Sequence, residues 1–400
     1  MSGTWLERAD QSLLGNYYPA RLTLVRGEGC RAFDDAGRSF LDLIGGIAVN
    51  SLGHCHPAVV RAIREQCGTL MHVSNLYRTP WSVRLAEALA ARLPGSRAFF
   101  CNSGAEANEA AIKLARRHAH FKCGASRHVV VSAEGSFHGR TFAALTATGQ
   151  PKYREGFEPL VPGFRYVPFG DAAALEAAVG DDVCAVLLEP IQGESGVRVP
   201  PPGYLTAAAD LCRRTGALLV LDEVQTGLGR TGTFLACEAE GVLPAVVTLS
   251  KSLGGGLPLG AMLARGEAAQ AFVPGTHAST FGGNPVSCAA ALAFLETLDS
   301  EKLLDRVRET GDWFMGELWE LAARQPKIAG VRGRGLLVAV DLTVPAKAVA
   351  LAAEERGYLV NAVQEQTLRF APPFIVTRGE LSDFLKIFSE ILVSTPSAGA

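Results

Sequence analysis

Between residues 51 and 290, short apolar runs alternate with alanine-rich stretches, and this alternation constrains the fold more than any other feature. The strand-like runs are residues 97–102 (RAFFCN), 128–133 (HVVVSA), 184–190 (CAVLLEP), 217–224 (ALLVLDEV) and 245–250 (AVVTLS). The stretches between them that predict helices include residues 106–120, 173–179 and 203–216. Near-continuous apolar strands joined through helices favour an α/β fold with a mostly parallel sheet, covered by helices on both faces. Ligands of such sheets bind beyond the carboxyl ends of the strands.

Changes in this pattern divide the chain into three parts. Residues 1–50 predict an irregular arm followed by a small hairpin, with glycine-containing turns at 27–29 and 35–37. Residues 51–290 form the predicted large domain. Residues 291–400 combine helical stretches with the strand-like runs LLVAVDL and LRFAPPF, which is typical of a smaller α+β domain. We expect the N-terminal arm to pack with this smaller domain.

Charge and cysteine content exclude several classes of protein. A net charge of −2 over 400 residues provides no basic field for nucleic acid or for an anionic membrane surface. The nine cysteines are scattered and odd in number, which favours free thiols in a reducing compartment. No apolar run approaches the roughly 20 residues that span a bilayer, and the N-terminus lacks the pattern of a signal peptide. We therefore predict a cytoplasmic protein that binds neither nucleic acid nor membrane.

One turn between a strand and a helix has the features of a phosphate site. In residues 100–116 (FCNSGAEANEAAIKLAR), the turn Ser103-Gly104-Ala105 precedes the helix, and Ser103 with Glu106 fits a capping box. The free N–H groups and the positive dipole at such a helix start suit a phosphate. The alternative is a plain capped helix, because capping boxes are common.

An acid and a lysine follow two of the predicted strands, so both are expected at the carboxyl edge of the sheet. Asp222 could pair with a protonated ring nitrogen; the alternatives are a structural acid that caps a loop or that pairs with an arginine such as Arg230. Lys251, in a site of low dielectric constant, would lose its charge more easily and could form an imine with an aldehyde. The alternative is an ordinary surface lysine. A phosphate turn, an acid for a ring nitrogen and a reactive lysine are together what pyridoxal 5′-phosphate requires.

Eight motifs, in order along nearly the whole chain, resemble the class III (ω-amino-acid) aminotransferases, which belong to fold type I of the pyridoxal-phosphate enzymes. They are residues 27–57, 100–116, 137–141 (FHGRT), 189–197 (EPIQGESGV), 221–232 (LDEVQTGLGRTG), 250–262 (SKSLGGGLPLGAM), 279–285 (STFGGNP) and 368–374 (LRFAPPF). The resemblance implies a large domain whose mostly parallel sheet is sandwiched by helices. It also implies a small α+β domain built from the N-terminal arm and the C-terminal segment, and a homodimer whose active sites are shared across the interface.

The same resemblance implies the residues that bind the cofactor. Lys251 would carry it and later move the proton, and Asp222 would keep the pyridine nitrogen protonated. The other expected contacts are the turn residues Ser103, Gly104 and Ala105, the ring-stacking Phe137 and Val224, Gln225 at the phenolic oxygen, and Thr280 from the neighbouring subunit at the phosphate. The family usually has Thr where this chain has Ala105, so one hydroxyl contact to the phosphate would be missing.

Within the family, the sequence is most similar to the enzymes that transfer the ω-amine of N2-acetyl-L-ornithine to 2-oxoglutarate in arginine biosynthesis. Arg140 would hold the α-carboxylate of the donor, and Ser279 of the neighbouring subunit would contact the acetylated donor. Arg369 would bind the α-carboxylate of 2-oxoglutarate, with Glu194 as a switch partner; a static salt bridge is the alternative. The last two substrate positions are Ile47, which is tyrosine in enzymes for free ornithine, and Tyr17, which either contacts substrate or packs in the arm.

Several alternatives stay open from the sequence alone. The donor could instead be N-succinyl-LL-diaminopimelate, N-succinylornithine or 4-aminobutyrate, and an aminomutase or a catalytically silent binding protein could share the fold. The cluster His54-Cys55-His56 has no second group of ligands at a suitable spacing, so we predict no metal site. His138 could be a general base, but Lys251 already fills that role, and a packed or solvent-facing histidine is favoured.

Overall fold

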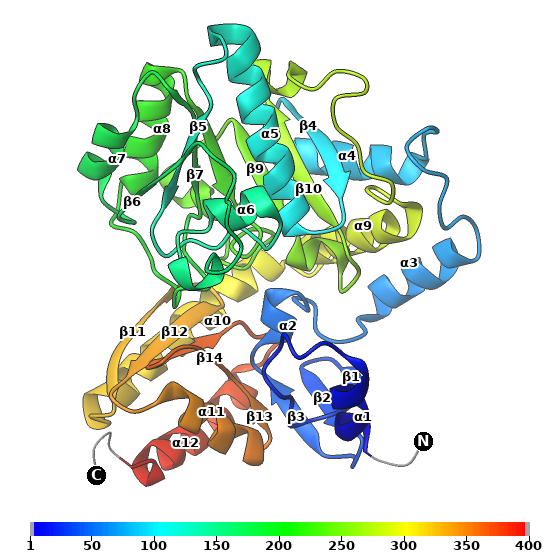
Figure 1. Cartoon of the computed structure of the whole chain (residues 1–400). Coiled ribbons are helices and arrows are strands. Elements are labelled where there is room, and N and C mark those ends of the chain that lie inside the picture. Colours follow the sequence, from blue (N-terminus) through cyan, green and yellow to red (C-terminus); the bar gives the residue numbers. More distant parts are fainter. Residues whose placement is uncertain (1–3, 397–400) are drawn as a thin grey trace.

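The computed structural model describes residues 4–396 and shows two lobes, of which the upper one in Figure 1 contains a seven-stranded sheet of order β4-β10-β9-β8-β7-β5-β6. Its strands are β4 (Ser96–Cys101), β5 (Val129–Ala133), β6 (Phe164–Val167), β7 (Val183–Leu188), β8 (Leu218–Asp222), β9 (Val246–Leu249) and β10 (Gly260–Arg265). β10 is antiparallel to β4 and β9, whereas every other neighbouring pair is parallel. The predicted α/β class with a mostly parallel sheet is therefore confirmed, and β6 and β10 are additions to the predicted strands.

Both faces of this sheet are covered by helices, as the continuous apolar strands predicted. On one face, Val130 and Val220 pack against α5 (Gly104–Cys123). On the other face, Val131 belongs to the core that includes α8 (Tyr204–Thr215). Helix α5 lies close to the sheet because its buried side consists largely of alanine. Successive side chains of one strand thus enter two separate cores.

The remaining elements of the upper lobe surround this sheet. They are α3 (Pro57–Cys67), α4 (Pro80–Arg92), α6 (Phe142–Ala147), α7 (Ala172–Ala178), α9 (Pro285–Ser300) and the short 3₁₀ turns η1 (Pro151–Tyr153), η2 (Ala236–Glu240), η3 (Lys251–Gly254) and η4 (Gly266–Gln270). The boundary predicted between residues 290 and 291 falls inside α9, which packs against α3, α4 and η3. We propose that the C-terminal part of the small domain begins instead at α10 (Leu303–Arg324).

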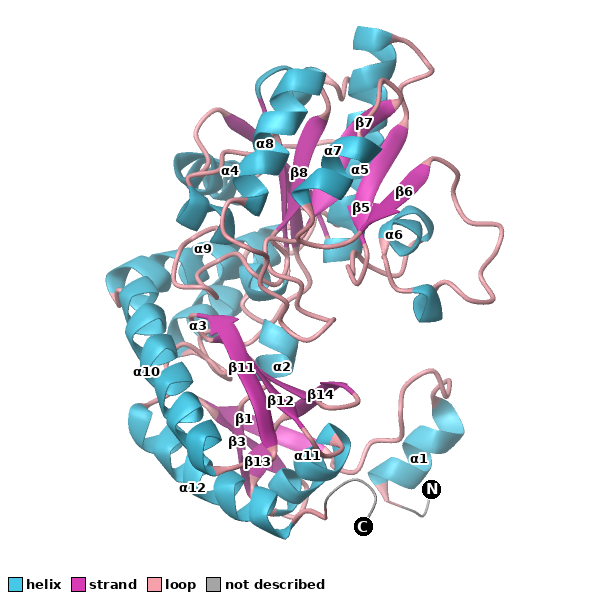
Figure 2. Ribbon diagram, turned by 90° about the vertical axis from the view of Figure 1, so that its left-hand side faces the viewer, coloured by secondary structure: helices cyan, strands magenta, loops and turns pink. Residues whose placement is uncertain are grey.

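The lower lobe joins the two ends of the chain. Its elements are α1 (Trp5–Ser12), β1 (Leu24–Glu28), β2 (Arg31–Asp34), β3 (Ser39–Asp42), α2 (Gly45–Ala48), β11 (Ile328–Arg334), β12 (Leu337–Leu342), α11 (Ala346–Glu355), β13 (Tyr358–Leu359), β14 (Asn361–Gln364), β15 (Thr367–Phe370) and α12 (Arg378–Ser394). Two four-stranded sheets form, of order β1-β2-β3-β13 and β11-β12-β15-β14. β13 pairs in parallel with β3, so the C-terminal segment adds a strand to the N-terminal sheet. Helix α10 contacts α9 above and β11 and α12 below, and it connects the lobes (Figure 2).

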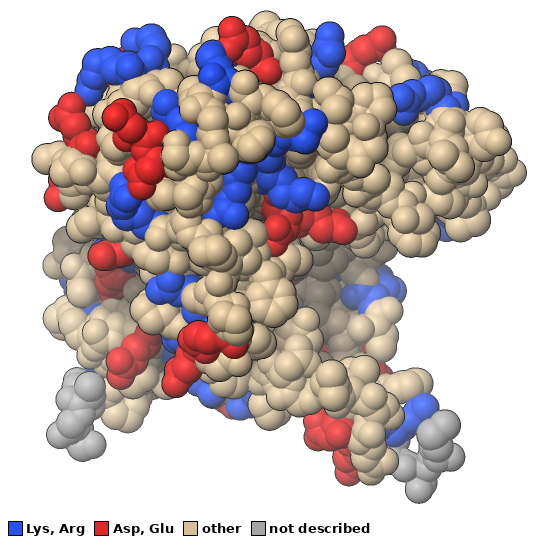
Figure 3. Space-filling view, turned by 45° about the horizontal axis from the view of Figure 1, so that its top comes forward, with Lys and Arg blue, Asp and Glu red and all other residues tan. Residues whose placement is uncertain are grey.

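The charged side chains, the cysteines and the helix lengths can be compared with the predictions made from composition. Lys and Arg are interspersed with Asp and Glu on the face drawn in Figure 3. The nine cysteines form no disulfide. Within residues 4–396, every helix is too short or too polar to cross a bilayer.

Candidate active site

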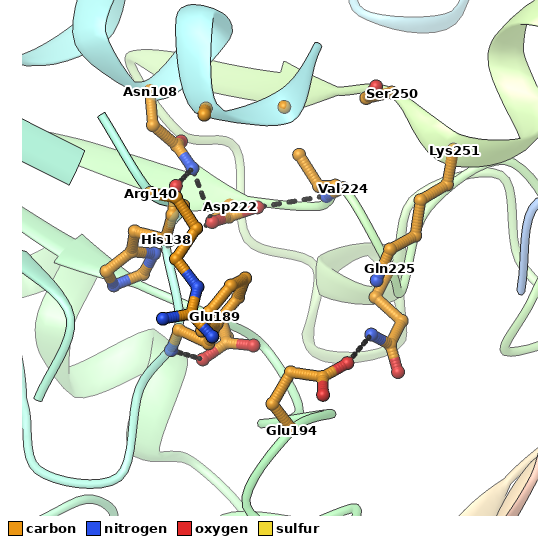
Figure 4. A pocket seen from close by; sticks show the side chains of 14 residues that line it. Asn108, His138, Arg140, Glu189, Glu194, Asp222, Val224, Gln225, Ser250 and Lys251 are labelled. Carbon is orange, nitrogen blue, oxygen red and sulfur yellow. Dashed lines mark hydrogen bonds and ion pairs between the residues drawn. The ribbon is translucent and has the colours of Figure 1, made fainter. Parts of the chain in front are cut away.

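The segments that follow several strands meet at one edge of the large sheet and line a cavity of about 290 Å³ (Figure 4). Its lining residues are Gly104, Ala105, Asn108, Phe137, His138, Gly139, Arg140, Glu189, Glu194, Asp222, Val224, Gln225, Ser250 and Lys251. They follow β4, β5, β7, β8 and β9, whose carboxyl ends lie at the same edge because these strands run in one direction. This is the edge at which the sequence predicted a ligand.

The turn before α5 presents free backbone donors to the cavity. Ser103 caps the helix, since its Oγ accepts the N–H of Glu106 at 3.2 Å. The Glu106 carboxylate accepts from the N–H of Asn102 at 2.6 Å rather than from Ser103, so only half of the predicted capping box forms. The N–H groups of Gly104 and Ala105 have no acceptor in the part of the chain that the structure describes. Free amides at the start of a 20-residue helix form an anion site.

Asp222 is buried at the end of β8 and is held by three donors. Its Oδ1 accepts the N–H of Val224 at 3.0 Å, and its Oδ2 accepts from Asn108 Nδ2 and faces His138 Nδ1, both at 2.7 Å (Figure 4). A carboxylate only accepts hydrogen bonds, so Nδ1 of His138 carries the hydrogen. These hydrogen bonds fix the orientation of the carboxylate at the cavity wall. The suggested pairing of Asp222 with Arg230 is wrong, because the partners of Asp222 are these three groups.

His138 and Asn108 are therefore functional neighbours of Asp222 rather than separate sites. His138 is fully buried, and its Nε2 lies 3.3 Å from Ser132 Oγ, so the packed interpretation is confirmed and the solvent-facing one is wrong. The sequence analysis did not select Asn108. Its amide also donates to the carbonyl of His138 at 2.8 Å and accepts from Thr248 Oγ1 at 2.8 Å. The sequence did contain a signal for Asn108, since it is a polar residue on an otherwise alanine-rich helix face. Buried polar groups need partners, so such a residue indicates a specific contact.

Lys251 begins the turn η3 and is half-buried, with a left-handed φ of 39°. Its Nζ has no hydrogen-bond partner among the described residues and points into the cavity (Figure 4). Burial lowers the pKa of the Lys251 ammonium to about 8, against the opposing influence of the Glu194 carboxylate. A substantial fraction of this amine is therefore neutral near pH 8, which is the nucleophilic form.

Arg369, on β15 of the lower lobe, contacts two residues that line the cavity and forms the predicted pair with Glu194. Its side chain is 2% exposed, and Nη1 lies 2.6 Å from Glu194 Oε1 and 3.0 Å from Gln225 Oε1. Its Nη2 donates to Asn361 Oδ1 at 2.8 Å. Burial raises the pKa of Glu194, but the cations of Arg369 and Lys251 outweigh that effect and hold it at about 2. The Glu194 carboxylate is therefore ionised at physiological pH.

Glu189 is the third acid of the cavity and was not among the residues predicted from the sequence. Its two oxygens accept the N–H groups of Phe137 at 3.0 Å and Gly193 at 3.3 Å. Burial and the nearby Asp222 raise the pKa of Glu189 well above its ordinary value. Glu189 directly follows β7, so the argument that selected Asp222 from its place at a strand end applies equally to this residue.

Arg140 lies at the mouth of the cavity. Its guanidinium stacks at 4.2 Å from the ring centre of Tyr153 and 5.6 Å from that of Phe137. The side chain is exposed, so it is free to meet a carboxylate that enters the cavity.

Six predicted substrate or cofactor positions are not among the residues that line this cavity. Ser103 and Arg369 each adjoin a lining residue, and the other four lie apart from it. Ser279 Oγ accepts the N–H of Gly282 at 3.0 Å, and the exposed Thr280 borders a separate small recess beside residues 72–77. Tyr17 is 84% exposed and Ile47 is 45% exposed. The structure of a single chain therefore assembles the cofactor positions around Lys251, but it leaves these four outside.

The two histidines of the cluster at residues 54–56 each face a carboxylate. His54 Nε2 lies 2.9 Å from Asp42 Oδ2, and His56 Nε2 lies 3.7 Å from Glu301 Oε1. Over residues 4–396, His, Cys, Asp and Glu side chains form no group of three or more that could hold a metal ion.

Comparison with known proteins places this fold and site in one family. The sequence profile described as aminotransferase class-III matches residues 15–392. The chain is 51% identical over 391 residues to the acetylornithine aminotransferase of Mycolicibacterium smegmatis, covering 97% of this chain and 98% of that protein. It is 48% identical over 378 residues to the acetylornithine aminotransferase of Caldanaerobacter subterraneus subsp. tengcongensis, covering 94% and 95%.

Similar solved structures are also aminotransferases. The ornithine aminotransferase from Toxoplasma gondii ME49 superposes with a TM-score of 0.94 at 34% identity, covering 97% of this chain and 94% of that one. The N-acetylornithine aminotransferase from Stenotrophomonas maltophilia K279a gives a TM-score of 0.84 at 37% identity, covering 97% and 98%. The chain therefore belongs to the class III aminotransferases, which are pyridoxal-phosphate enzymes of fold type I.

The cavity fits the cofactor of this family. Two glycines allow the walls of the cavity to pack closely, because any larger residue would clash. A Cβ on Gly104 would lie 2.8 Å from Val224 Cγ1, and one on Gly139 would lie 2.6 Å from Ala105 Cβ. Free N–H donors at one end, a buried carboxylate and an unpaired lysine amine are the donor set that a phosphorylated, basic aldehyde needs.

Proposed function

We propose that the protein transfers the ω-amine of N2-acetyl-L-ornithine to 2-oxoglutarate, giving N-acetyl-L-glutamate 5-semialdehyde and L-glutamate, a step of arginine biosynthesis. The observation that carries this proposal is the meeting of Lys251, Asp222 and the free start of α5 in a cavity bordered by the Glu194–Arg369 pair. The relatives named acetylornithine aminotransferase, at about half identity, support the choice of donor. The nine unpaired cysteines favour a cytoplasmic location.

The cofactor roles follow the donor set of the cavity. The N–H groups of Gly104 and Ala105, next to Ser103, would hold the phosphate, and Asp222 would hold the ring nitrogen. Phe137 and Val224 would cover the ring faces, and Gln225 would meet the phenolic oxygen. Thr280 of a second subunit would complete the phosphate site, whereas Ala105 has no hydroxyl to add. When bound, pyridoxal phosphate supplies a reactive aldehyde and an electron-withdrawing ring.

Lys251 has two tasks in this scheme. Its neutral amine would hold the cofactor in the absence of the donor. With the donor bound, the same Nζ would accept the proton from the donor carbon that bears the amine. A pKa near 8 suits both tasks, because a catalytic base works best when its pKa lies near the working pH.

The charged residues of the cavity then select the substrates. Arg140, exposed at the mouth, would bind the α-carboxylate of the donor. While Glu194 neutralises Arg369, the site demands no carboxylate next to the reacting carbon, which suits an ω-amine. When 2-oxoglutarate enters, we propose that the pair opens and Arg369 takes its α-carboxylate. Ser279 of the second subunit, Ile47 and Tyr17 would lie on the acyl side of the donor.

A panel of donors with 2-oxoglutarate as acceptor tests this function. We expect kcat/KM for N2-acetyl-L-ornithine to exceed that for free ornithine and for 4-aminobutyrate by at least about tenfold, because an apolar pocket gains roughly 1–3 kcal/mol from a fitting group. N-succinylornithine and N-succinyl-LL-diaminopimelate test the size of the acyl pocket in the same assay. A higher kcat/KM for free ornithine or 4-aminobutyrate would reject the acylated donor.

Uptake of the cofactor should report the pKa of Lys251. We expect the rate at which apoenzyme binds pyridoxal phosphate to rise with pH and to be half-maximal near 8, since burial lowers this pKa from 10.5 and only the neutral amine reacts. Stopped-flow absorbance from about pH 6.5 to 10 measures this rate. The reaction of pyridoxal phosphate with a free lysine derivative is the reference, because it shows the effect of the cofactor's own ionisation. A rate that still rises steeply above pH 9 would show an unshifted lysine.

The switch can be tested with Glu194→Gln. Without the carboxylate, Arg369 stays uncompensated and attracts any α-carboxylate to the reacting end. We therefore expect kcat/KM for glutamate, relative to that for the ω-amine donor, to rise by about tenfold. Glu176→Gln, which alters an exposed acid paired with Arg214, is the matched control. An unchanged ratio would support the static salt bridge instead.

We also propose that two chains form the active unit and that Thr280 and Ser279 serve the neighbouring site. Exposed apolar side chains gather beside them: Leu76, Tyr77 and Phe281 are exposed, and the tilted rings of Phe281 and His72 have centres 5.1 Å apart. Such a patch marks an interaction surface. Sedimentation should give the mass of two chains, and Tyr77→Asp should give single chains with reduced cofactor content. Trp319→Asp, at an exposed apolar position on α10, is the control. A fully active single chain would contradict the proposal.

A further inference from the structure

Arg230 is a buried cation that none of the chemistry above uses. It lies on the loop after β8, its side chain is completely buried, and no carboxylate of residues 4–396 pairs with it. Its Nε has no acceptor in the described structure, and burial alone lowers the pKa of its guanidinium to about 9. A buried charge without a counter-ion weakens a fold, so a contribution to stability does not explain this residue.

One end of the guanidinium is bonded to the lower lobe. Nη1 donates to the carbonyl of Leu336 at 3.0 Å and to that of Pro372 at 2.6 Å. The backbone of Leu336 also donates to the Arg230 carbonyl at 3.1 Å, and the guanidinium lies 4.6 Å from the ring centre of Phe374. Pro372 is three residues beyond Arg369, so Arg230 holds the segment that carries the proposed carboxylate-binding arginine.

The other end starts a chain of hydroxyls that leads to the lysine turn. Nη2 donates to Ser51 Oγ at 2.8 Å, Ser51 Oγ lies 2.6 Å from Ser252 Oγ, and Ser252 Oγ donates to the carbonyl of Ala48 at 2.9 Å. The carbonyl of Ala48 can only accept, so the single hydroxyl hydrogen of Ser252 is directed to it, and Ser51 must donate to Ser252. Ser252 is the residue next to Lys251.

The chain ends on a strained piece of backbone. Residues 45–48, labelled α2, have φ values of 59°, 61°, 63° and 64°, which is a left-handed turn that includes the non-glycine residues Ile47 and Ala48. Left-handed backbone is unfavourable for residues that carry a Cβ. It persists only where the surroundings hold it, and such strain gathers at functional sites. The hydrogen bond from Ser252 to Ala48 is one of the contacts that hold it.

We propose that Arg230 is a positioning residue for transamination, which fixes the segment after Arg369 and the left-handed turn at residues 45–48 in register with Lys251. Its two ends act on different features. The contact with Pro372 places Arg369, and the contact with Ser51 places the turn of Lys251 through Ser252. The inference rests on the proposed function only in taking 2-oxoglutarate as the ligand of Arg369.

Three variants of the full-length holoenzyme separate these two ends. Arg230→Lys replaces the forked guanidinium by a single amine and so weakens both sets of contacts, whereas Ser51→Ala removes only the hydroxyl chain. Arg308→Lys is the control. Arg308 also binds a carbonyl of this loop, that of Gly232, but it is partly exposed and paired with Asp305. Rates are expressed per bound cofactor, and melting temperatures are recorded alongside. We expect Arg230→Lys to lower kcat and raise KM for 2-oxoglutarate, each by about tenfold or more, since small displacements of reacting groups have large effects.

For Ser51→Ala we expect a similar fall in kcat with KM for 2-oxoglutarate within about twofold, because the contact with Pro372 remains. The control should match the wild type. Normal kcat and KM per bound cofactor in both test variants, with only a lower melting temperature, would overturn the proposal and leave Arg230 a structural residue. If Arg230→Lys does not fold, Ser51→Ala decides alone. The comparison uses whichever ω-amine the wild type accepts, so failure with acetylornithine would reject the donor without affecting this test.

Discussion

Lys251→Ala is expected to lower kcat by at least about 10⁴-fold, the largest effect of any single substitution in this chain. The variant loses both the amine that holds the cofactor and the base that takes the proton from the donor carbon. No second lysine lines the cavity to replace it within the described residues. Single-turnover absorbance with the ω-amine donor measures the loss directly.

Two further measurements make this result specific to Lys251. Lys386→Ala removes an exposed lysine that pairs with Asp383, and it should leave the rate unchanged. Adding a small primary amine to the Lys251→Ala enzyme should restore part of the rate, because a free amine can enter the vacated space and accept the proton. A Lys251→Ala enzyme that keeps more than about a tenth of the wild-type kcat would refute the assignment.

Asp222→Asn is expected to have the second-largest effect, a fall in kcat of about 10²–10³-fold. The amide has nearly the same shape but no charge, so it cannot stabilise a protonated ring nitrogen. In the wild type, Asn108 Nδ2 and His138 Nδ1 both lie 2.7 Å from the Asp222 carboxylate. The amide of the variant has only one oxygen, so its NH₂ group would face a donor. At least one buried donor therefore loses its partner. The same single-turnover assay applies.

The matched control for this variant is Asp182→Asn. Asp182 pairs with Arg165 at 2.9 Å on the surface, where an ion pair contributes little. We expect its rate to equal that of the wild type. A rate within about tenfold of wild type for Asp222→Asn would show that the carboxylate is not the partner of the ring nitrogen.

The large sheet was predictable because its central strands are apolar throughout, which only a two-sided core allows. The strands that the sequence did not reveal differ in this respect. β6 is a half-buried edge strand, so its residues FRYV lack a continuous apolar pattern. β10 begins at Gly260 inside a glycine-rich motif, and its antiparallel pairing on both sides departs from the alternating pattern of strands and helices.

The functional residues also divide into those that the sequence pattern could select and those that it could not. Lys251 and Asp222 could be selected because each follows a strand, and this place in the sequence fixes their place in space. Asn108 could not be assigned, because its contact joins residues 114 positions apart and depends on how closely α5 approaches the sheet. The contact between Arg369 and Glu194 spans 175 positions and two lobes, and only the family resemblance predicted it. The roles proposed for Thr280 and Ser279 require a second chain.

The central claim is that the ε-amine of Lys251 holds pyridoxal phosphate. Reduction of the holoenzyme with borohydride converts that link into a stable secondary amine, which peptide mass mapping then locates. We predict that the added mass lies on the peptide that contains Lys251 and on no other. An added mass on a different lysine, or an unmodified Lys251 in fully reduced holoenzyme, would contradict the account.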